Sequence, residues 1–570
     1  MNTLIICEKP SVAKTVAAAL GARERKDGYI AGDGILVSWC VGHLVSMSDA
    51  GGYDERYKKW RYEDLPILPE EWKYTLTPGK EAQFAVLKEL MHRDDVSEIV
   101  NACDAGREGE LIFRFVYEQA SCNKPFKRLW ISSMEDSAIR DGFANLRDGR
   151  EYDALYHSAL CRARADWIVG INATRLFSVL YHKTLNVGRV LSPTLNLLVE
   201  RDGKITTFKK EKYHIVHIGC GGADAQSEHI SDAAEADKLK TSCCAAQAVC
   251  VSLTKEKKTQ APPKLFDLTS LQREANRVYG FTAKQTLDYA QALYEKRLLT
   301  YPRTDSNYLT SDMEQTAADL VGMILPLLPF MQDAELTPEI RRVLDDSKVS
   351  DHHAILPTAE FAKTGFAGLA ESEKKLMTLI CCKLLCAVAP VHVYESVTAV
   401  FACGGEQFTA KGKTVLVDGW KDLDRRFRST LKEKAADGGE NETALPELAE
   451  GQTFNIPSAS VSEHYTTPPK EYTEDTLLSA MENAGKEDMP DDATRAAMIE
   501  KLLSAGFVQR KGKSLIPTKD GVNLCVILPD MLKSPLLTAE WENRLTEIAK
   551  GNADPDDFMQ GITDMTRELI

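Results

Sequence analysis

A tyrosine, a proline and an arginine stand side by side within residues 298–306, Leu-Leu-Thr-Tyr-Pro-Arg-Thr-Asp-Ser. Proline blocks helical continuation and biases the residue before it towards an extended backbone, so the phenol of Tyr301 can project from the end of a helical module. The guanidinium of Arg303 can then bind a phosphate with paired hydrogen bonds. A single tyrosine is more often a core or strand residue. The neighbouring proline and arginine favour instead a nucleophile that holds a phosphate.

Carboxylates follow two predicted strands near the N-terminus. Residues 3–8 form a short apolar run that ends on Glu8, and residues 97–104 form another that ends on Asp104. A helical pattern follows each run, with Glu108 in the first turn of the second helix. This alternation predicts a parallel α/β sheet, whose ligand site lies beyond the carboxyl ends of the strands. One acidic residue at a strand end is usually only solvated, but three at such ends predict a Mg²⁺ site with oxygen ligands.

Two helical patterns lead into the tyrosine segment. Apolar residues recur at helical spacing over 268–279 and again over 281–295. Gly280 is a suitable stop for the first helix, and Thr282 is a suitable N-cap for the second. A similar order, two helices and then a basic hairpin, returns over 472–517 without a tyrosine nucleophile. The sequence therefore predicts two helix-turn-helix modules, the first of which ends in the tyrosine segment.

With these landmarks in the family's order along nearly the whole chain, the sequence resembles the type IA DNA topoisomerases and, among them, the bacterial topoisomerase III group. The resemblance implies a multidomain α/β plus α+β protein. Its parts would be a Toprim parallel α/β domain, two winged-helix or CAP-like helical domains and a β-rich arch, which together form a toroid. The implied reaction starts when Tyr301 attacks single-stranded DNA and keeps the 5′ phosphate. Strand passage and resealing would then relax negative supercoils and decatenate DNA without ATP.

The same resemblance assigns catalytic roles to residues around the tyrosine. Glu8 is implied to lie near the 3′ oxygen, where it would act as general acid and then as general base. Lys9 and Arg303 would offset the charge that develops on the phosphoryl oxygens. His352 matches a family histidine, and His353 matches less closely. Either one would hydrogen-bond the scissile phosphate or move a proton, whereas adjacent histidines can also be ordinary polar loop residues.

The metal site departs from the family pattern at one position. That pattern is an early glutamate followed by Asp-x-Asp-x-Glu, and in this chain Gly106 stands where the middle aspartate often lies. One usual ligand is thus missing. We therefore expect a single Mg²⁺, bound by Glu8, Asp104, Glu108, water and a DNA phosphate, and not two ions.

Basic helical stretches at 161–177 and 186–202 resemble family segments that line a groove for single-stranded DNA. Such a groove follows the phosphate backbone with positive charge, although an individual arginine is more often an ordinary surface residue. The second helix-turn-helix module is expected to add contacts, but residues 489–492 are Met-Pro-Asp-Asp where the family usually has a Gly-Thr segment. The expected DNA-binding residues are Arg162, Arg164, Arg175, Arg189, Ser192, Thr194, His353, Thr494 and Arg495.

Changes of pattern along the chain divide it into four predicted domains. These are a Toprim domain at 1–150, a DNA-groove domain at 151–208 and 468–570, a β-rich arch or hinge at 209–261 and 390–467, and a winged-helix domain with the tyrosine at 262–389. Because two β-rich segments flank a helical one, we expect a single sheet interrupted by the tyrosine domain.

Length, charge and cysteine content set outer limits. A chain of 570 residues exceeds one ordinary core, and a net charge of −14 argues against indiscriminate nucleic-acid binding while it allows a local basic groove. The 14 cysteines include no Cys-x2-Cys pair, so we expect free structural thiols. The longest apolar run, near 321–331, is broken by prolines and shorter than the roughly 18 residues of a membrane span.

These features predict a cytoplasmic, nucleoid-associated enzyme with no signal peptide or membrane segment. We expect a monomer that acts on single-stranded and negatively supercoiled DNA, with a helicase or a single-strand-binding protein as a candidate partner. The sequence stops inside a helical pattern at 564–570, which leaves open a longer natural chain.

Two other functions compete with this interpretation. A Toprim nuclease or primase shares the acidic site but uses water or a nucleotide, and the tyrosine segment with its paired helix-turn-helix modules disfavours it. A catalytically silent single-strand DNA-binding or scaffold protein would bind DNA yet leave supercoiled plasmid unchanged in the presence of Mg²⁺. A trapped covalent protein–DNA adduct excludes the first, and plasmid relaxation excludes the second.

Overall fold

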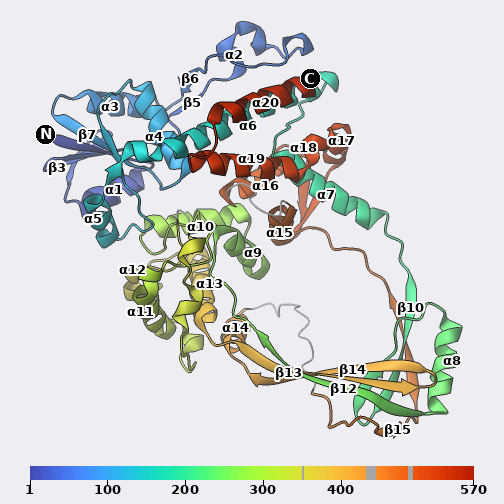
Figure 1. Ribbon diagram of the computed structural model, residues 1–570. Helices are drawn as coiled ribbons and strands as arrows, with labels where there is room; N and C mark the ends of the chain where they lie inside the picture. The colour runs from blue at the N-terminus through green and yellow to red at the C-terminus, as the bar shows by residue number, and fades with distance from the viewer. Residues whose placement is uncertain (350–351, 432–443, 485–491) are drawn as a thin grey trace.

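The elements of the protein are laid out in a ring (Figure 1). The computed structural model describes residues 1–349, 352–431, 444–484 and 492–570, with side chains from residue 495 onward in the last stretch. An N-terminal α/β unit and the C-terminal helices lie at the top of the view, and a β-sheet lies at the bottom. Helices form one side and extended chain forms the other. This outline and the mixed α/β content confirm the predicted toroidal fold class.

The N-terminal unit is built on a seven-stranded sheet in the order β2-β3-β4-β1-β7-β8-β9. Its four central strands β4, β1, β7 and β8 run parallel, as predicted, whereas the edge strands β2, β3 and β9 are antiparallel. Turns at Gly28 and Gly34, with φ of 78° and 76°, connect the antiparallel edge without a crossover helix. The strands are β1 (Asn2–Cys7), β2 (Glu24–Lys26), β3 (Tyr29–Gly32), β4 (Ile35–Trp39), β7 (Val96–Ala102), β8 (Phe126–Arg128) and β9 (Arg147–Asp148).

Helices cover both faces of this sheet because successive residues of its central strands are apolar and point to opposite faces. Leu4 and Ile6 of β1 face a cluster with α3 (Glu81–His92) and α4 (Arg107–Gln119). Ile5 and Cys7 face the opposite cluster with α1 (Pro10–Ala19) and α5 (Asp136–Ala144). A hairpin of β5 (Val45–Met47) and β6 (Tyr74–Leu76), with the short helix α2 (Ala50–Tyr53) between them, extends from the sheet. The carboxyl ends of β1, β4 and β7 therefore meet at one edge.

Segments far apart in the sequence share the second core, which we call the groove unit. Long helices from the middle of the chain pack against C-terminal helices in a single apolar cluster. Its hairpin β17–β18 follows two helices, which confirms the second helix-turn-helix pattern. The elements are α6 (Asp153–Leu180), α7 (Leu191–Thr206), α15 (Glu474–Ala484), α16 (Asp492–Ser504), β17 (Val508–Lys511), β18 (Ser514–Pro517), α17 (Lys519–Ile527), α18 (Asp530–Lys533), α19 (Pro535–Ala549) and α20 (Pro555–Leu569).

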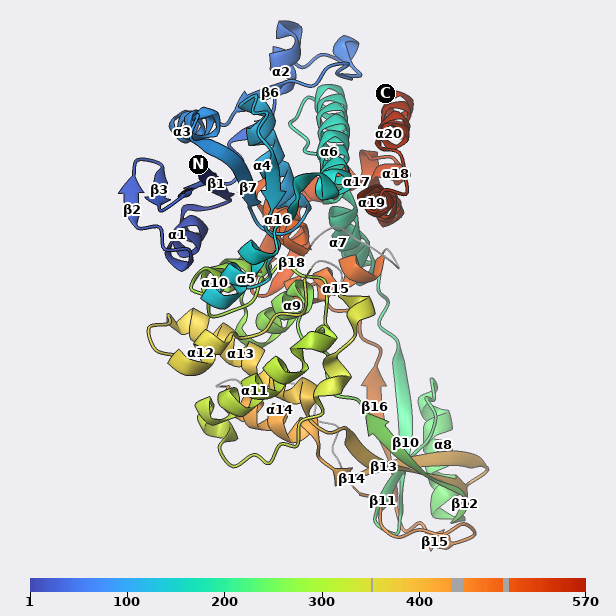
Figure 2. The same cartoon turned by 60° about the vertical axis from the view of Figure 1, so that its left-hand side comes forward.

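The arch is a second seven-stranded sheet, in the order β15-β12-β13-β14-β11-β10-β16. Every pairing in it is antiparallel, and it joins strands from both sides of the helical insert. Figure 2 shows β10 and β16 running side by side from the groove unit down to this sheet. The elements are β10 (Lys212–Cys220), β11 (Ala223–Gln226), α8 (Ala233–Cys244), β12 (Gln247–Gln260), β13 (His392–Cys403), β14 (Glu406–Val417), β15 (Thr453–Asn455) and β16 (Ala459–Tyr465).

The tyrosine unit consists of α9 (Leu268–Tyr279), α10 (Ala283–Glu295), α11 (Glu314–Ile324), α12 (Ala359–Thr364), α13 (Glu371–Val388) and, after strand β14, α14 (Trp420–Ser429) around one core. Gly280 ends α9 in the left-handed conformation at φ 71°, and Thr282 caps α10 by accepting from the backbone N–H of Gln285, as predicted. No hairpin follows α10 among the described residues. Isolated bridges such as Leu299 to Pro357 occupy its place.

All 14 cysteines are free thiols, and all but Cys244 are buried, as the sequence predicts. Burial raises the pKa of Cys161 to about 11, which is typical of an inert structural thiol. In the described part of the chain, no helix is both long enough and apolar enough to cross a bilayer.

Candidate active site

Tyr301 lies where the tyrosine unit meets the N-terminal unit. Its backbone N–H donates to the carbonyl of Ser132 at 2.9 Å. Its ring belongs to the same apolar cluster as Ile5 and Cys7 of the sheet, and the residue is only 7% exposed. The phenol thus leaves its own helical unit, as Pro302 predicts. The N-terminal unit encloses this side chain, however, so the phenol is not exposed to solvent.

His352 connects the tyrosine to the loop that follows β7. Its ring centroid lies 4.5 Å from that of Tyr301. Nε2 donates to the carbonyl of Ala105 at 2.6 Å, so Nδ1 accepts from the hydroxyl of Ser132 at 3.0 Å. Burial lowers the pKa of His352, which agrees with a neutral ring. Both ring nitrogens are engaged within the protein, so a contact with a phosphate requires this arrangement to change.

Two buried carboxylates stand at the ends of β1 and β7, beside the tyrosine. Glu8 is 8% exposed and Asp104 is 9% exposed. Burial and the charge of Asp104 raise the pKa of Glu8 to about 7, while Lys9 and Arg303 oppose that shift. A carboxyl group with a pKa near neutrality can both donate and accept a proton at physiological pH, which suits the predicted acid–base role. Two such oxygen donors side by side also match a hard divalent cation.

Glu108 bonds to a residue outside this pair, although its charge contributes to the raised pKa of Glu8. Its carboxylate accepts from Nε2 of His43 at 2.5 Å and is 55% exposed. Burial raises the pKa of Glu108, but the hydrogen bond from His43 and nearby positive charges outweigh it, so the net shift is downward. Among the residues that the structure describes, no three Asp, Glu, His or Cys side chains are arranged to hold a metal ion. The predicted ligand set of Glu8, Asp104 and Glu108 is therefore not assembled in this conformation.

Sequence reasoning missed His43. This residue follows β4, a third parallel strand whose carboxyl end lies at the same edge as those of β1 and β7. The strand pattern over residues 35–39 was the available signal, because polar side chains just after parallel strands gather at one edge.

Lys9 forms an ion pair across the two units. Its Nζ lies 3.3 Å from Oε1 of Glu295, the last residue of α10. The hydroxyl of Ser11 donates to the other carboxylate oxygen at 2.9 Å, and Gln291 donates to the first at 3.1 Å. The expected phosphate position beside Lys9 thus contains a carboxylate at the start of α1, a place that favours anions. Glu295 was not predicted from the sequence, although it stands six residues before Tyr301.

Gly106 has φ 155° and ψ 175°, a conformation that residues with a side chain rarely adopt. We expect Gly106→Asp to destabilise the protein by about 1–3 kcal/mol, because the backbone is strained even though a Cβ would meet nothing within 4 Å. The measurement is the shift of the thermal unfolding midpoint. Gly170→Asp, at a helical glycine where a Cβ also has open space, is the control for added charge. Equal shifts in the two variants would contradict a backbone effect.

The raised pKa of Glu8 makes stability depend on pH. Its carboxyl binds a proton more tightly in the folded chain, at a pKa of about 7, than at the ordinary 4.5. We therefore expect stability to fall as pH rises between these values, by about 3 kcal/mol. Thermal unfolding of the wild type and Glu8→Gln in chelator, from pH 4 to 8, tests this. The stability advantage of the variant should grow with pH, and parallel curves would show that Glu8 titrates normally.

Several of the residues expected to line the groove are buried and form intramolecular bonds in this conformation. Arg189, 4% exposed, donates to Asp166 at 2.9 Å and to Glu542 at 3.0 Å. Arg175, 7% exposed, donates to the carbonyl of Tyr57 at 2.8 Å. These arginines are neutralised or covered by the protein itself, so neither offers a free guanidinium to a phosphate in this conformation.

The buried hydroxyls and Arg495 likewise serve the fold. Ser192 accepts from the backbone N–H of Gly188 at 3.3 Å. Thr194 donates to the carbonyl of Val190 at 2.7 Å inside α7. Arg495, 7% exposed, donates to the hydroxyl of Thr269 at 2.8 Å and so joins α16 to α9. The side chain of Thr494 lies outside the described residues.

Arg162, Arg164 and His353 remain as partly exposed candidates. Arg162 lies 3.9 Å from Glu542. Burial raises the pKa of Glu108, and the positive charge of Arg162 adds to the larger opposing effect of His43, which lowers that pKa. Arg164 donates to the hydroxyl of Tyr74 at 3.0 Å. His353 donates from Nδ1 to the carbonyl of Ala354 at 2.7 Å, and burial lowers its pKa. Arg162 is the predicted groove residue that lies nearest to the acidic site by these interactions.

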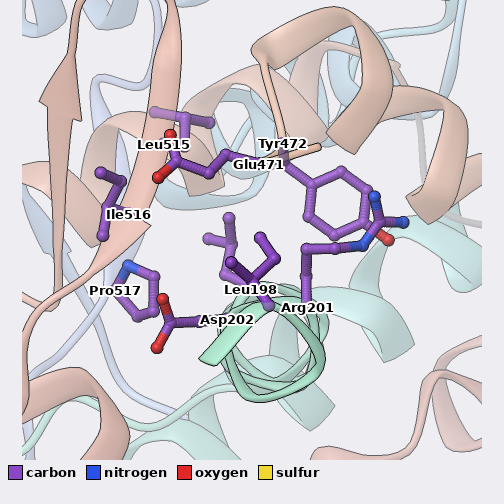
Figure 3. Close-up of a pocket in the computed structure, with 9 residues that line it drawn as sticks. Leu198, Arg201, Asp202, Glu471, Tyr472, Leu515, Ile516 and Pro517 are labelled. Carbon is purple, nitrogen blue, oxygen red and sulfur yellow. The ribbon is translucent and has the colours of Figure 1, made fainter. Parts of the chain in front are cut away.

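A separate pocket lies in the groove unit, between α7 and β18 (Figure 3). Arg201 lies over the ring of Tyr472 at 4.0 Å and donates to the carbonyl of Lys470 at 2.9 Å. Leu198 and Pro517 complete its apolar wall. The candidate active-site residues Tyr301, Glu8 and Asp104 do not line this pocket, whose walls are formed by α7, β18 and the segment before α15.

Comparison with known proteins gives concordant matches over the whole chain. A family model described as DNA topoisomerase matches residues 150–560, and a Toprim domain model matches residues 3–134. Curated proteins named DNA topoisomerase 3 from Bacillus licheniformis and Bacillus subtilis are 41% and 40% identical to this chain, over all of it and 81% of their own length. The match to the solved structure of full-length topoisomerase I from Thermotoga maritima covers 99% of this chain and 90% of that structure's chain, with a TM-score of 0.77 and 24% identity.

Proposed function

Because the chain belongs to the type IA DNA topoisomerases, we propose that Tyr301 cuts one DNA strand, holds its 5′ phosphate during strand passage and then reseals it. The observation that carries this assignment is the position of the Tyr301 side chain. Tyr301 is packed against His352 at the edge where Glu8 and Asp104 end their strands. A nucleophile, an acid with a pKa near 7 and positive charge from Lys9 and Arg303 thus meet in one place.

In the proposed cleavage step, the phenol oxygen of Tyr301 forms a bond to phosphorus as the bond from phosphorus to the 3′ oxygen breaks. The departing 3′ oxygen takes a proton from Glu8, and the phenol proton passes to water. Arg303 and Lys9 stabilise the charge on the phosphoryl oxygens. Resealing reverses these events: the Glu8 carboxylate takes the proton of the 3′ hydroxyl, which attacks phosphorus and releases the tyrosine.

A divalent cation, which we propose to be Mg²⁺, would be held by Glu8 and Asp104, with Glu108 joining once its bond to His43 breaks. When bound, the ion supplies a Lewis acid that favours ionisation of the 3′ hydroxyl. The protein residues align the DNA end and exclude competing water. The Toprim domain supports this assignment, because the domain typically binds divalent metal in topoisomerases.

Entry of DNA requires the tyrosine unit to part from the N-terminal unit. Tyr301 is enclosed between them, and the interface is fastened by Lys9 to Glu295, Arg297 to Asp136 and the bonds of His352. Their separation would open the ring at the cut, with the arch as hinge. We propose the four-domain division given above for this motion, with Arg162 and Arg164 as contacts to single-stranded DNA.

The proposed setting is the bacterial nucleoid. We propose a cytoplasmic monomer that acts on single-stranded and negatively supercoiled DNA and decatenates it, with a helicase or single-strand-binding protein that supplies the single strands. The relatives named DNA topoisomerase 3 support DNA as the substrate.

Plasmid relaxation tests the proposal. Negatively supercoiled plasmid is incubated with the protein, with Mg²⁺ or with chelator and without ATP, and half of each sample is denatured before electrophoresis. We expect a ladder of relaxed topoisomers with Mg²⁺ and a protein-bound 5′ end after denaturation. Nicked or linear product without an adduct would indicate a nuclease, and unchanged topoisomers with DNA binding would indicate a silent binding protein.

A further inference from the structure

A buried arginine lies beneath the acidic loop and takes no part in the chemistry above. Arg128 ends β8 and is 1% exposed. Its Nη1 donates to the carbonyls of Asn101, Cys103 and Leu129 at 3.1, 2.7 and 2.9 Å, and its Nη2 donates to the carbonyl of Asp104 at 2.7 Å. One side chain therefore bonds to the end of β7, to the loop that leads into α4 and to the residue that follows β8.

The charge of this arginine is balanced inside the same unit. Nε of Arg128 lies 3.1 Å from Oε2 of Glu110, a fully buried carboxylate. Glu110 also accepts from Asn101 at 2.9 Å and from Nε of Arg114 at 3.0 Å. A pair buried to this extent contributes little net stability against apolar residues of the same size, so its contribution has to be sought in the geometry it imposes.

Three consecutive carbonyls of the loop are held from two different units. Arg128 holds those of Cys103 and Asp104, and His352 of the tyrosine unit holds that of Ala105. Unpaired carbonyls at a buried site are costly, so these bonds fix the peptide planes. With the planes fixed, the direction of the Asp104 Cα–Cβ bond is fixed as well, which limits the positions that the carboxylate can take to those of its rotamers. When the ring opens, His352 leaves and Arg128 remains.

We propose that Arg128 is a positioning residue of the acidic site, which holds the Asp104 backbone so that its carboxylate stays beside Glu8 and the pair keeps its affinity for a divalent cation while the ring is open. This inference rests on the proposed function, since the cation site is part of it. Arg128 touches neither DNA nor the reacting atoms. It acts through two peptide groups, and these remain bonded during the stage at which the 3′ hydroxyl has to be held for resealing.

The test compares Arg128→Lys with Arg114→Lys in the intact chain. Lysine keeps the positive charge but cannot donate to several carbonyls in the fixed geometry of a guanidinium. Arg114 contacts the same Glu110 but donates to the carbonyl of Gly149 and not to the acidic loop, which makes it the matched control. Mg²⁺ binding is measured by calorimetric titration without DNA, well below the unfolding temperature of each variant.

We expect Arg128→Lys to weaken Mg²⁺ binding about tenfold, in the range seen when an outer partner of a metal ligand is lost, and Arg114→Lys to leave it within a factor of two. Equal affinities in all three proteins, or equal losses in both variants, would overturn the inference. Should Arg128→Lys not fold, the double variant Arg128→Met, Glu110→Met removes the buried pair together. Wild-type affinity in that folded protein overturns the inference too. Absence of Mg²⁺ binding by the wild type would instead refute the proposed cation site.

Discussion

Replacement of Tyr301 by phenylalanine is expected to abolish DNA cleavage and plasmid relaxation while single-strand binding persists. The substitution removes only the phenol oxygen, and the ring keeps its place against His352 and Tyr294. Loss of a nucleophile lowers the rate of covalent catalysis by roughly 10⁶-fold, so no adduct should be detectable. Stability should change by only about 0.5–1.5 kcal/mol for each hydrogen bond of the phenol that is lost. Denaturing electrophoresis of end-labelled single-stranded DNA after incubation measures the adduct.

Tyr294 supplies the matched control for this experiment. It is another buried tyrosine, 1% exposed, and its ring centroid lies 5.4 Å from that of Tyr301. Burial raises its pKa well above the ordinary value, which disfavours the phenolate needed for attack. Tyr294→Phe should still form the adduct. An adduct formed by Tyr301→Phe would show that Tyr301 is not the nucleophile. Loss of the adduct only in Tyr294→Phe would identify Tyr294 as the nucleophile, and either result would refute the site described here.

Arg303→Ala is expected to slow cleavage by roughly 10²–10³-fold, the usual cost of losing a donor to developing negative charge. The half-buried guanidinium lies close enough to the acidic site to oppose the rise in the pKa of Glu8, which burial and Asp104 cause. Its removal should therefore raise that pKa further. Resealing, which needs the Glu8 carboxylate, should then require a higher pH. Single-turnover cleavage and resealing of an oligonucleotide from pH 6 to 9 measures both effects.

Arg303→Lys separates charge from geometry. Lysine keeps the charge near Glu8 but loses the paired donors, so the pH profile should return towards that of the wild type while cleavage is only partly restored. A cleavage rate in Arg303→Ala equal to that of the wild type would make Arg303 an ordinary surface residue. A slower rate with an unchanged pH profile would leave the phosphate contact standing and contradict the electrostatic link to Glu8.

Local signals in the sequence sufficed for the elements that carry the chemistry. The apolar runs before Glu8 and Asp104 are strands β1 and β7, and the glycine and threonine at 280 and 282 end and begin helices as their types predict. These features depend on residues within a few positions of one another. The parallel sheet followed from the same alternation, because parallel strands need helical crossovers.

The state of each site residue could not be predicted, because its partners are distant in the sequence. Arg189 appears as a free cation until Glu542, 353 residues away, is placed beside it. His352 appears as a candidate proton carrier until Ser132 and Ala105 occupy both of its nitrogens. Charge and residue type are local properties, whereas burial and pairing depend on tertiary contacts. The intramolecular pairing of Arg189 and His352 therefore could not be predicted, and neither could the ion pair between Lys9 and Glu295.

The attachment of the tyrosine unit to the arch has a mechanical consequence. Gln260 at the end of β12, His392 at the start of β13 and Val417 at the end of β14 lie together in one three-stranded ribbon, where Gln260 pairs with His392 and Val393 pairs with Val417. In the opening proposed above, the tyrosine unit would turn about this ribbon, where three of the chain connections between the unit and the arch lie together. Torque on the cut strand would then reach the arch across the hydrogen bonds of this ribbon. The stiffness of the ribbon, and not the strength of the contacts around Tyr301, would limit how far the tyrosine unit turns.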